Sequence, residues 1–226
     1  RYGFHGTSHP YVSKKTAEFL HKPLSETNCI VMHLGNGSSL SCTKNGKCLD
    51  TSMGLTPLEG MIMGTRCGTL DPAIVPFIMK KKGFTPEEMD TLMNKKSGLQ
   101  ALCGSADMRD VHKERENGNK RAELAFRMLV HGIKKILGSY FFLLGGKVDA
   151  VTFTAGIGEH DELVRAAVME GLEGIGFKLD PEANRARKSG ARAISAPDSR
   201  IPILVIPTNE ELQIAETAVE VVSKNK

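Results

Sequence analysis

The sequence lacks the marks of several large protein classes. It has five cysteines, an odd number, and none forms a Cys-x-x-Cys pair, so a zinc site or a disulfide framework is not expected. Reduced thiols in a cytoplasmic setting are the simplest interpretation. No apolar run is long enough to span a membrane, since the stretch Tyr140–Leu144 is short and runs into two glycines. We therefore expect a cytoplasmic protein without a membrane partner.

Marks of nucleic-acid binding are also missing. The 30 basic and 26 acidic residues are mixed along the 226-residue chain, the net charge is only +4, and no basic run carries interleaved aromatic residues. The length allows one large domain or two small ones. The chain begins at Arg1 with neither an initiator methionine nor a signal peptide, so we expect a fragment or a separately expressed domain.

Two common nucleotide-binding fingerprints are absent as well. The chain contains no Gly-x-x-x-x-Gly-Lys-Ser/Thr motif. The segment Gly156–Glu159 continues with His160 and Asp161, so it does not complete a Gly-x-Gly-x-x-Gly pattern. A P-loop or Rossmann site is therefore not predicted, and no internal repeat points to a solenoid.

A glycine turn between two apolar segments is the most informative feature that is present. The run Val31–Leu34 ends in Gly35-Asn36-Gly37, and serines follow at once. Glycines without a Cβ let main-chain N–H groups approach an anion, which favours a phosphate-binding loop. The alternative is an ordinary hairpin turn, which Gly-Asn-Gly also makes.

Hydrophobic periodicity predicts a mixed α/β fold. Strands are expected at residues 28–34, 38–43, 47–50, 148–154 and 201–206, with Asn45-Gly46 as a type I′ turn. Helices are expected at residues 8–21 with Ser8 as cap, from Asp71, from Thr85, at 119–144, at 161–172 and after 211, the last with Leu212, Ala215, Val219 and Val222 facing inward. Strand–loop–helix units behind hairpins imply a mixed sheet covered by helices.

Irregular segments are the candidate functional sites. The long loop at residues 51–70 and the loops at 33–39, 64–68, 105–110, 155–160 and 207–211 follow strand ends or lack periodicity, so they could converge on one cleft. Arg66, between Gly64 and Gly68, could reach a phosphoryl group or pair with a surface carboxylate. Asp107 and Arg109 could form a local salt bridge or grip a ribose or base. His131 is expected to be packed or partly exposed rather than a ligand.

Taken together, these segments resemble the acetate kinase family. The similar segments, in chain order, are Arg1–His9, His33–Ser39, Thr51–Gly60, Met63–Arg66, Thr154–Glu159 and Pro207–Glu211. They extend from the first residue almost to the last. The resemblance implies a ribonuclease-H-like mixed sheet flanked by helices, of the actin-like, sugar-kinase-like ATPase superfamily. It further implies that residues 1–226 form only the C-terminal nucleotide-binding lobe, with a joining segment at 1–27.

The family resemblance implies reversible transfer of the ATP γ-phosphoryl group to acetate, giving acetyl phosphate and ADP, with Mg²⁺ or Mn²⁺. By the same resemblance, the catalytic residues are His5, Arg66 and Asn36, and Glu210 helps to hold the metal. The nucleotide contacts are His33, Leu34, Gly35, Asn36, Gly37, Asp107, Met108, Arg109, Gly156, Ile157, Gly158, Glu159 and His160. An acid that orients acetate belongs to the N-terminal lobe, so the isolated chain is expected to be inactive. A homodimer is also implied.

Two departures from the family pattern concern the adenosine pocket. His160 stands where asparagine is usual, and Met108 where an aromatic residue is common. Two other functions remain open at this point. One is a propionate or butyrate kinase with the same loops, because one methylene changes specificity by only about 1–3 kcal/mol. The other is a non-catalytic nucleotide-binding or dimerisation module.

Overall fold

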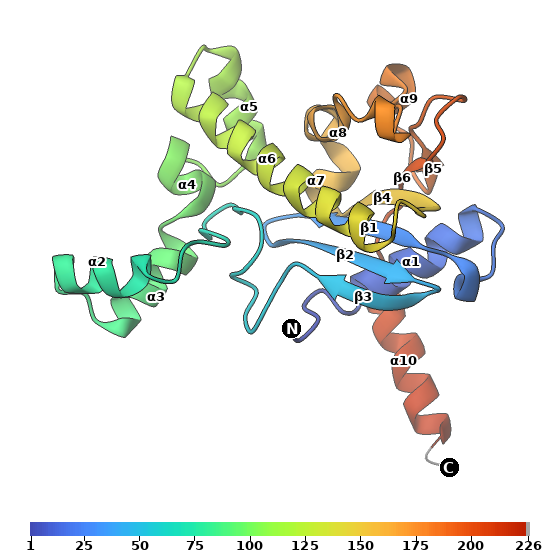
Figure 1. Ribbon diagram of the computed structural model, residues 1–226, viewed down its shortest axis with the longest axis horizontal. Helices are drawn as coiled ribbons and strands as arrows, with labels where there is room; N and C mark the ends of the chain where they lie inside the picture. Colours follow the sequence, from blue (N-terminus) through green and yellow to red (C-terminus); the bar gives the residue numbers. More distant parts are fainter. Residues whose placement is uncertain (225–226) are drawn as a thin grey trace.

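A six-stranded mixed sheet forms the centre of the molecule (Figure 1). The computed structural model describes residues 1–224. Its strands are β1 (Cys29–Leu34), β2 (Ser38–Lys44), β3 (Lys47–Thr51), β4 (Ala150–Thr154), β5 (Arg192–Ala193) and β6 (Ile203–Val205). They lie in the order β3-β2-β1-β4-β6-β5, and β4 runs parallel to both β1 and β6 while the other pairs are antiparallel. The predicted α/β fold, a ribonuclease-H-like mixed sheet flanked by helices, is confirmed.

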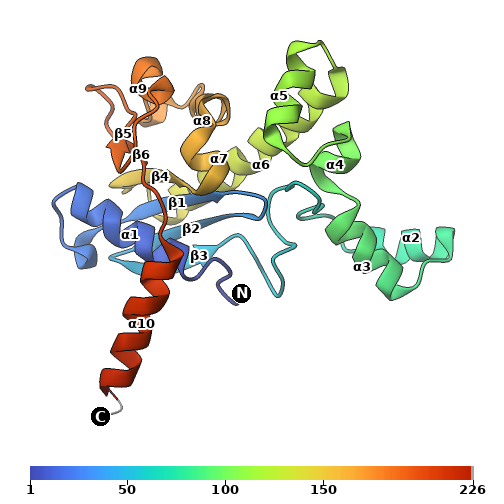
Figure 2. The ribbon, with the colours of Figure 1, turned by 180° about the vertical axis from the view of Figure 1, so that it is seen from behind.

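Helices cover both faces of the sheet (Figures 1 and 2). Helix α1 (Ser8–Phe19) packs on the face to which Cys29 and Val31 point, and helix α6 (Lys120–Leu143) packs on the face to which Ile30 and Met32 point. All six residues of β1 are buried. Burial on both faces explains why this strand is an almost continuous apolar run instead of an alternating one.

Helix α6 follows its predicted pattern. Asn119 caps it by accepting hydrogen bonds from the backbone N–H groups of Arg121 and Ala122. Its buried stripe is Ala122, Ala125, Phe126, Leu129, Ile133, Leu137 and Tyr140. Met128 lies beside this stripe and is 39% exposed. His131 is exposed, whereas the sequence predicted a packed or partly exposed side chain.

Two hairpin turns connect the first three strands. Gly35-Asn36-Gly37 joins β1 to β2, and Asn45-Gly46 joins β2 to β3. Asn45 and Gly46 both have positive φ, +53° and +71°, as a type I′ turn requires. Both predicted hairpins are thus confirmed.

A group of short helices lies to one side of the sheet (Figure 1). They are α2 (Ile74–Lys82), α3 (Pro86–Lys95), α4 (Gly98–Cys103) and α5 (Met108–Glu116). Thr85 caps α3 as predicted, and it does so through a capping box with Glu88. Asp71 was expected to cap this helix, but the N-cap is Ala73, two residues later, because the Asp71 carboxylate accepts from Ala73 N–H and closes a turn before the helix. Residues 52–73 contain no helix or strand, as expected of a long loop.

The region after β4 differs from its prediction. Residues 155–160, expected as a loop, form the short helix α7 (Ala155–His160). The chain then breaks at Asp161, whose carboxylate caps α8 (Glu162–Met169) through Leu163 and Val164. Two shorter helices complete this part of the fold, η2 (Glu173–Ile175) and α9 (Pro181–Arg185), while the short helix η1 (Leu24–Glu26) lies earlier, between α1 and β1.

The last helix, α10 (Glu210–Lys224), contradicts its prediction most clearly. Leu212, Ala215, Val219 and Val222 were expected to face inward, yet no residue of α10 is buried, and Val219 is 67% exposed. Figure 1 shows α10 extending away from the sheet. Its apolar pattern is real, but the described chain does not cover that face.

The N-terminal segment also differs in detail. Thr7, not Ser8, stands at the N-cap of α1, and it makes no side-chain cap hydrogen bond. The Ser8 hydroxyl instead lies 2.8 Å from both His33 Nδ1 and Thr208 Oγ1. This leaves the start of α1 tied to β1 and to the segment before α10. Within residues 1–224, no helix is long and apolar enough to cross a membrane.

Candidate active site

The site lies where the parallel strands β1 and β4 end side by side. His33 of β1 is paired in register with Thr154 of β4. The glycine hairpin leaves the first strand and α7 leaves the second, so both connections start from the same edge of the sheet. In open α/β sheets, ligands bind at this edge. Ala155 makes the turn with a φ of +65°, a left-handed conformation rare outside glycine.

A cavity of about 1020 Å³ opens at this edge. Three of the predicted loops supply one wall, and the segment at residues 184–189 supplies another. The predicted nucleotide residues that line it are Gly35, Asn36, Asp107, Met108, Arg109, Gly156, Ile157, Glu159 and His160. The structure therefore brings together residues that lie more than 120 positions apart in the chain.

Four predicted nucleotide residues do not line this cavity. His33 and Leu34 are strand residues with buried side chains, and Gly158 is buried where α7 packs on β4. A Cβ on Gly158 would lie 3.4 Å from the Phe153 carbonyl carbon, so this glycine allows close helix–strand packing. Gly37 lies on the other side of the hairpin, toward Arg66.

The other side of the hairpin holds the two predicted transition-state residues. A Cβ placed on Gly37 would lie 3.2 Å from Arg66 Nη1 and 3.4 Å from His5 Nε2. Arg66 therefore points to the glycine turn rather than to the surface. Its Nη1 also donates to the Pro57 carbonyl at 3.1 Å, which holds the side chain within the long loop. The guanidinium has no ion pair among the described residues, so the alternative of a surface salt bridge is not realised.

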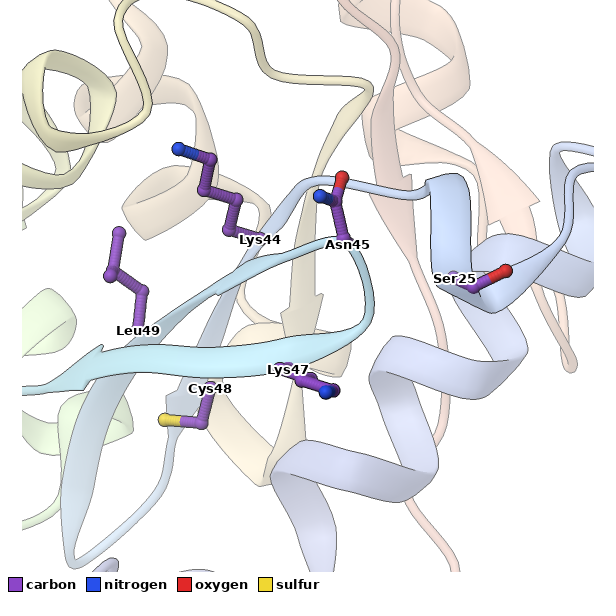
Figure 3. Close-up of a pocket in the computed structure, with 6 residues that line it drawn as sticks. All are labelled: Ser25, Lys44, Asn45, Lys47, Cys48 and Leu49. Carbon is purple, nitrogen blue, oxygen red and sulfur yellow. The ribbon is translucent and has the colours of Figure 1, made fainter.

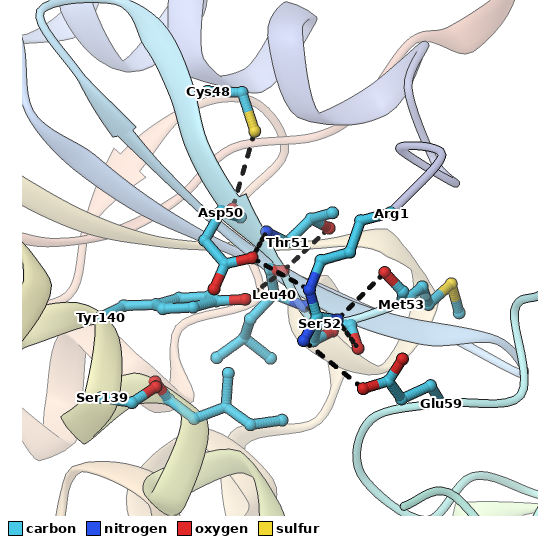
Figure 4. Close-up of polar contacts among 11 residues, drawn as sticks. Arg1, Leu40, Cys48, Asp50, Thr51, Ser52, Met53, Glu59, Ser139 and Tyr140 are labelled. Atoms are coloured by element: carbon cyan, nitrogen blue, oxygen red, sulfur yellow. Dashed lines mark hydrogen bonds and ion pairs between the residues drawn. The ribbon is translucent and has the colours of Figure 1, made fainter. Parts of the chain in front are cut away.

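The segment that carries His5 is anchored at its start (Figure 4). Arg1 Nη1 donates to the carbonyls of Ser52 and Met53, and its guanidinium pairs with Asp50 at 3.2 Å and Glu59 at 3.4 Å. His5 itself has a φ of +59°. A non-glycine residue in that conformation is held by its surroundings, here by stacking on His33 and by the hydrogen bond between His5 Nδ1 and Ser39 Oγ.

Three histidines form a cluster behind the hairpin. The His5 and His33 rings stack with centroids 3.9 Å apart, and His9 lies about 6 Å from both. Burial lowers the pKa of His9 and of His33 to about 3. Burial and the Arg66 charge also lower the pKa of His5, and the negative charge of Glu210 offsets part of this decrease. All three rings are therefore neutral at pH 7 and can donate or accept without carrying charge.

The Asp107–Arg109 pair forms the local salt bridge, the first of its two predicted alternatives. The Asp107 carboxylate caps α5 and accepts from Arg109 Nε and Nη2, at 3.0 and 2.6 Å. This contact holds the pKa of Asp107 down, at about 2. Both residues line the cavity at its solvent-exposed mouth. The predicted local salt bridge is thus present where a nucleotide could reach it.

Two glutamates order the ends of the site. Glu159 Oε1 accepts from the backbone N–H groups of Ala155 and Thr208, which joins α7 to the segment before α10. Glu210 accepts one hydrogen bond from Thr7 Oγ1 at 2.9 Å and is otherwise exposed. No group of three or more His, Cys, Asp or Glu residues among residues 1–224 could hold a metal alone. A single exposed carboxylate still fits Mg²⁺, which binds one or two carboxylates together with substrate phosphates.

Sequence reasoning missed part of the cavity wall. Arg165 is 2% exposed, and it donates to the Gly158 carbonyl and to both oxygens of Asn184. It thereby ties α7 to α9. Burial lowers its pKa to about 10. The other missed part of the wall is the basic run at residues 185–192, in which four of eight residues are Arg or Lys. This run could have indicated an anion site, but charge runs are usually solvated surface.

A second hollow lies at the Asn45-Gly46 turn (Figure 3). Its volume is about 480 Å³, and it is lined by Ser25, Lys44, Asn45, Lys47, Cys48 and Leu49. None of these six side chains is buried. It therefore has no preformed polar group that would select a ligand.

Comparison with known proteins identifies the family to which the chain is similar. The sequence profile of the Acetokinase family matches residues 1–216. The chain is 70% identical over 224 residues to an acetate kinase of Desulfovibrio desulfuricans, covering 99% of this chain and 56% of that protein. The chain thus spans about half the length of the curated relatives it matches.

Solved structures show the same fold. A crystal structure of Porphyromonas gingivalis acetate kinase superposes with a TM-score of 0.94 at 41% identity, covering 98% of this chain and 56% of that one. A propionate kinase from Francisella tularensis gives 0.88 at 42% identity, covering 95% and 54%. The family match over nearly the whole chain, together with these relatives, shows that the chain belongs to the acetokinase family.

Proposed function

We propose that this chain is the C-terminal, nucleotide-binding lobe of a kinase that moves the γ-phosphoryl group of ATP to acetate and back. The single observation that carries the proposal is the meeting of Arg66 Nη1 and His5 Nε2 at Gly37, beside a cavity lined by the other predicted loops. The names of the curated relatives, acetate kinases at 53–70% identity, support the choice of acetate.

Phosphoryl transfer requires positioning and positive charge more than covalent chemistry. Adenosine would occupy the cavity between α5, α7 and residues 184–189, and its phosphates would extend to the glycine hairpin. Arg66 and neutral His5 would donate to the phosphoryl oxygens as charge spreads in the transition state. Asn36, exposed at the hairpin tip, would add a neutral donor near the transferring group.

The metal would supply charge neutralisation on the phosphate oxygens. Glu210 would hold Mg²⁺, or Mn²⁺, the role that the family resemblance implies for it. Two observations support this role: its carboxylate is exposed, and its charge acts on the His5 ring, which places it near the phosphoryl side of the site. The acid that orients the acceptor would come from outside this chain. We place the protein in the cytoplasm, a setting consistent with its five free thiols, and expect it to form a homodimer.

A matched glycine pair tests the nucleotide cavity. Gly156 lines the cavity, has ordinary φ, and has nothing within 4 Å of the position its Cβ would take. Gly156→Val should therefore fold but fill the cavity, and calorimetric titration of the chain with Mg-ADP should show binding weakened at least about tenfold. Gly174→Val is the control, since Gly174 is equally open and lies outside the cavity. If the two variants bind Mg-ADP with equal affinity, the nucleotide does not bind in this cavity.

A second candidate function keeps the site and changes the acceptor. The Francisella tularensis structure, named a propionate kinase, is as similar in sequence as the acetate kinase structure, at 42% against 41% identity. Comparing kcat/KM for acetate, propionate and butyrate on a full-length protein that contains this chain decides between them. We expect acetate to be favoured, with kcat/KM falling by a factor of about ten or more for each added methylene.

A further inference from the structure

A line of hydrogen bonds runs from the interior of the molecule to His5. Ser41 Oγ lies 2.8 Å from His9 Nδ1, His9 Nε2 lies 2.7 Å from Ser39 Oγ, and Ser39 Oγ lies 2.7 Å from His5 Nδ1. Ser39 and Ser41 are two residues apart on β2, so their side chains share the face that α1 covers. Both serines and His9 are buried.

Ser41 sets the direction of this line. Its bond to His9 is the only hydrogen bond that its hydroxyl makes within residues 1–224. A buried O–H without an acceptor is unfavourable, so the Ser41 hydroxyl donates to His9 Nδ1. The reverse direction would turn His9 Nδ1 into a donor and leave the Ser41 proton without a partner.

The donor at Ser41 fixes the donor and acceptor at every later hydrogen bond, because each neutral imidazole has one donor and one acceptor nitrogen. Burial lowers the pKa of His9 to about 3, so His9 is neutral. With Nδ1 accepting, its Nε2 carries the proton and donates to Ser39 Oγ. The Ser39 hydroxyl in turn donates to His5 Nδ1, and the His5 proton resides on Nε2.

That tautomer matters at the site. His5 Nε2 is the ring nitrogen at Gly37, beside Arg66. Phosphoryl oxygens only accept hydrogen bonds, so a ring that presented an unprotonated Nε2 would repel them. The line of hydrogen bonds therefore selects the form of His5 that can bind the transferring group.

We propose that Ser39 is a positioning residue for His5: with His9 and Ser41 it holds the His5 imidazole in the tautomer protonated on Nε2, ready to donate to the phosphoryl group. The inference rests on the proposed function, because it takes His5 as a donor in phosphoryl transfer. It adds three residues that do not touch the substrate.

Nitrogen NMR tests the tautomers directly and without any activity. The chain is labelled with ¹⁵N-histidine, and the His5 and His9 signals are assigned from His5→Gln and His9→Gln variants. The imidazole shifts distinguish protonated from unprotonated nitrogens. We expect protonated Nε2 and unprotonated Nδ1 in both rings. A proton on Nδ1 of either ring would overturn the proposal.

Serine variants test the consequence for catalysis in a full-length protein that contains this chain. Ser39→Ala should lower kcat about tenfold, the size expected from one lost hydrogen bond, with the ATP KM nearly unchanged. Ser41→Ala should lower kcat less, although Ser41 does not contact His5. Ser13→Ala is the matched control, because Ser13 is a buried serine of α1 whose hydroxyl has no hydrogen-bond partner among the described residues.

Unchanged kcat in both Ser39→Ala and Ser41→Ala, or a change in KM alone, would refute the positioning role. If Ser39→Ala fails to fold, the tautomers of the unmodified chain and the Ser41→Ala kinetics still decide. A full-length protein that phosphorylates no short-chain acid would instead refute the proposed function, and the tautomer measurement would be unaffected by that result.

Discussion

At the scale of single residues, the site depends on the absence of a side chain at Gly37. The space where a Cβ would stand is bordered by Arg66 Nη1 and His5 Nε2. A guanidinium and a neutral imidazole are both donors, and the glycine would let the phosphoryl group of the proposed reaction approach them. The same turn with a side chain at position 37 would still join β1 to β2, but it would separate the two donors from a ligand.

Replacing Arg66 should affect the transition state more than the bound substrate. In a full-length protein that contains this chain, Arg66→Ala should lower kcat on the order of a thousandfold, because an arginine in this role stabilises charge that develops during transfer. The ATP KM should change much less. Steady-state kinetics with Arg66→Lys as the control separate loss of charge from loss of the fork. An effect on KM alone would remove Arg66 from the transition-state role.

The buried histidines predict how stability changes with pH. The pKa of His9 and of His33 is about 3 in the folded chain and near the ordinary value of 6.5 when unfolded. Between these values the unfolded state binds more protons, so the free energy of unfolding falls as the pH drops below about 6.5 and is constant above it for these two groups. Each ring adds a slope of up to about 1.4 kcal/mol per pH unit.

Urea unfolding at about pH 7 and about pH 5 measures this slope, and the m-value checks that the transition remains two-state. His9→Gln removes one titrating ring, so its stability should depend less on pH in that window even though the variant is less stable at pH 7. Identical slopes for the two proteins would show that His9 does not titrate as described.

At the scale of elements, α6 and α10 have similar amphipathic patterns and different environments. Seven residues of α6 are buried against the sheet and its neighbours, whereas none of α10 is buried. Periodicity shows that a helix has an apolar face, but it does not say which surface covers that face. The prediction for α10 failed because the pattern was taken to imply burial within this chain.

Two glycines of α6 provide a matched stability test. Gly138 has nothing within 4 Å of its would-be Cβ, whereas that of Gly132 would lie 3.0 Å from Met61 Cβ. Gly138→Ala should stabilise the chain by about 0.5–1 kcal/mol, because alanine loses less entropy in a helix. Gly132→Ala should show no such gain, since it crowds Met61. Thermal unfolding of both variants measures the difference, and an equal rise in Tm would contradict the close contact.

At the scale of the whole molecule, one edge of the sheet organises the site. The parallel pairing of β1 and β4 places the glycine hairpin next to α7, although about 120 residues separate them. The intervening chain folds into the long loop with Arg66 and into helices α2 to α6. Under the proposed function, the hairpin would thus divide the site into an adenosine side, lined by α5 and α7, and a phosphoryl side with Arg66 and the histidines.

The chain by itself should bind nucleotide weakly and form no acetyl phosphate. It matches only 56% of the length of its curated relative, and an acid for the acceptor is expected outside it. Light scattering gives its oligomeric state, calorimetry with Mg-ADP its affinity, and a steady-state assay its activity. Acetyl phosphate production at a rate near that of a full-length kinase would contradict the expectation that a second lobe is required.

The sequence by itself determined five of the six strands, the hairpin turns, the long helices and the residue types that suit a phosphate site. These depend on local causes: periodicity, glycine conformations such as Gly46, and caps such as Thr85 and Asn119 act within a few residues. The family resemblance added which loops belong to one site, and the cavity and the Gly37 contacts agree with that grouping.

Only the tertiary structure decided which groups touch. It placed Ser39 between His5 and His9, buried Arg165 against Asn184, turned Ser8 from a helix cap into a partner of His33, and left α10 uncovered. These outcomes depend on strand pairing and packing between residues far apart in the chain, where a hydroxyl or an apolar face has several possible partners. Local sequence lists the candidates, and the three-dimensional arrangement selects among them.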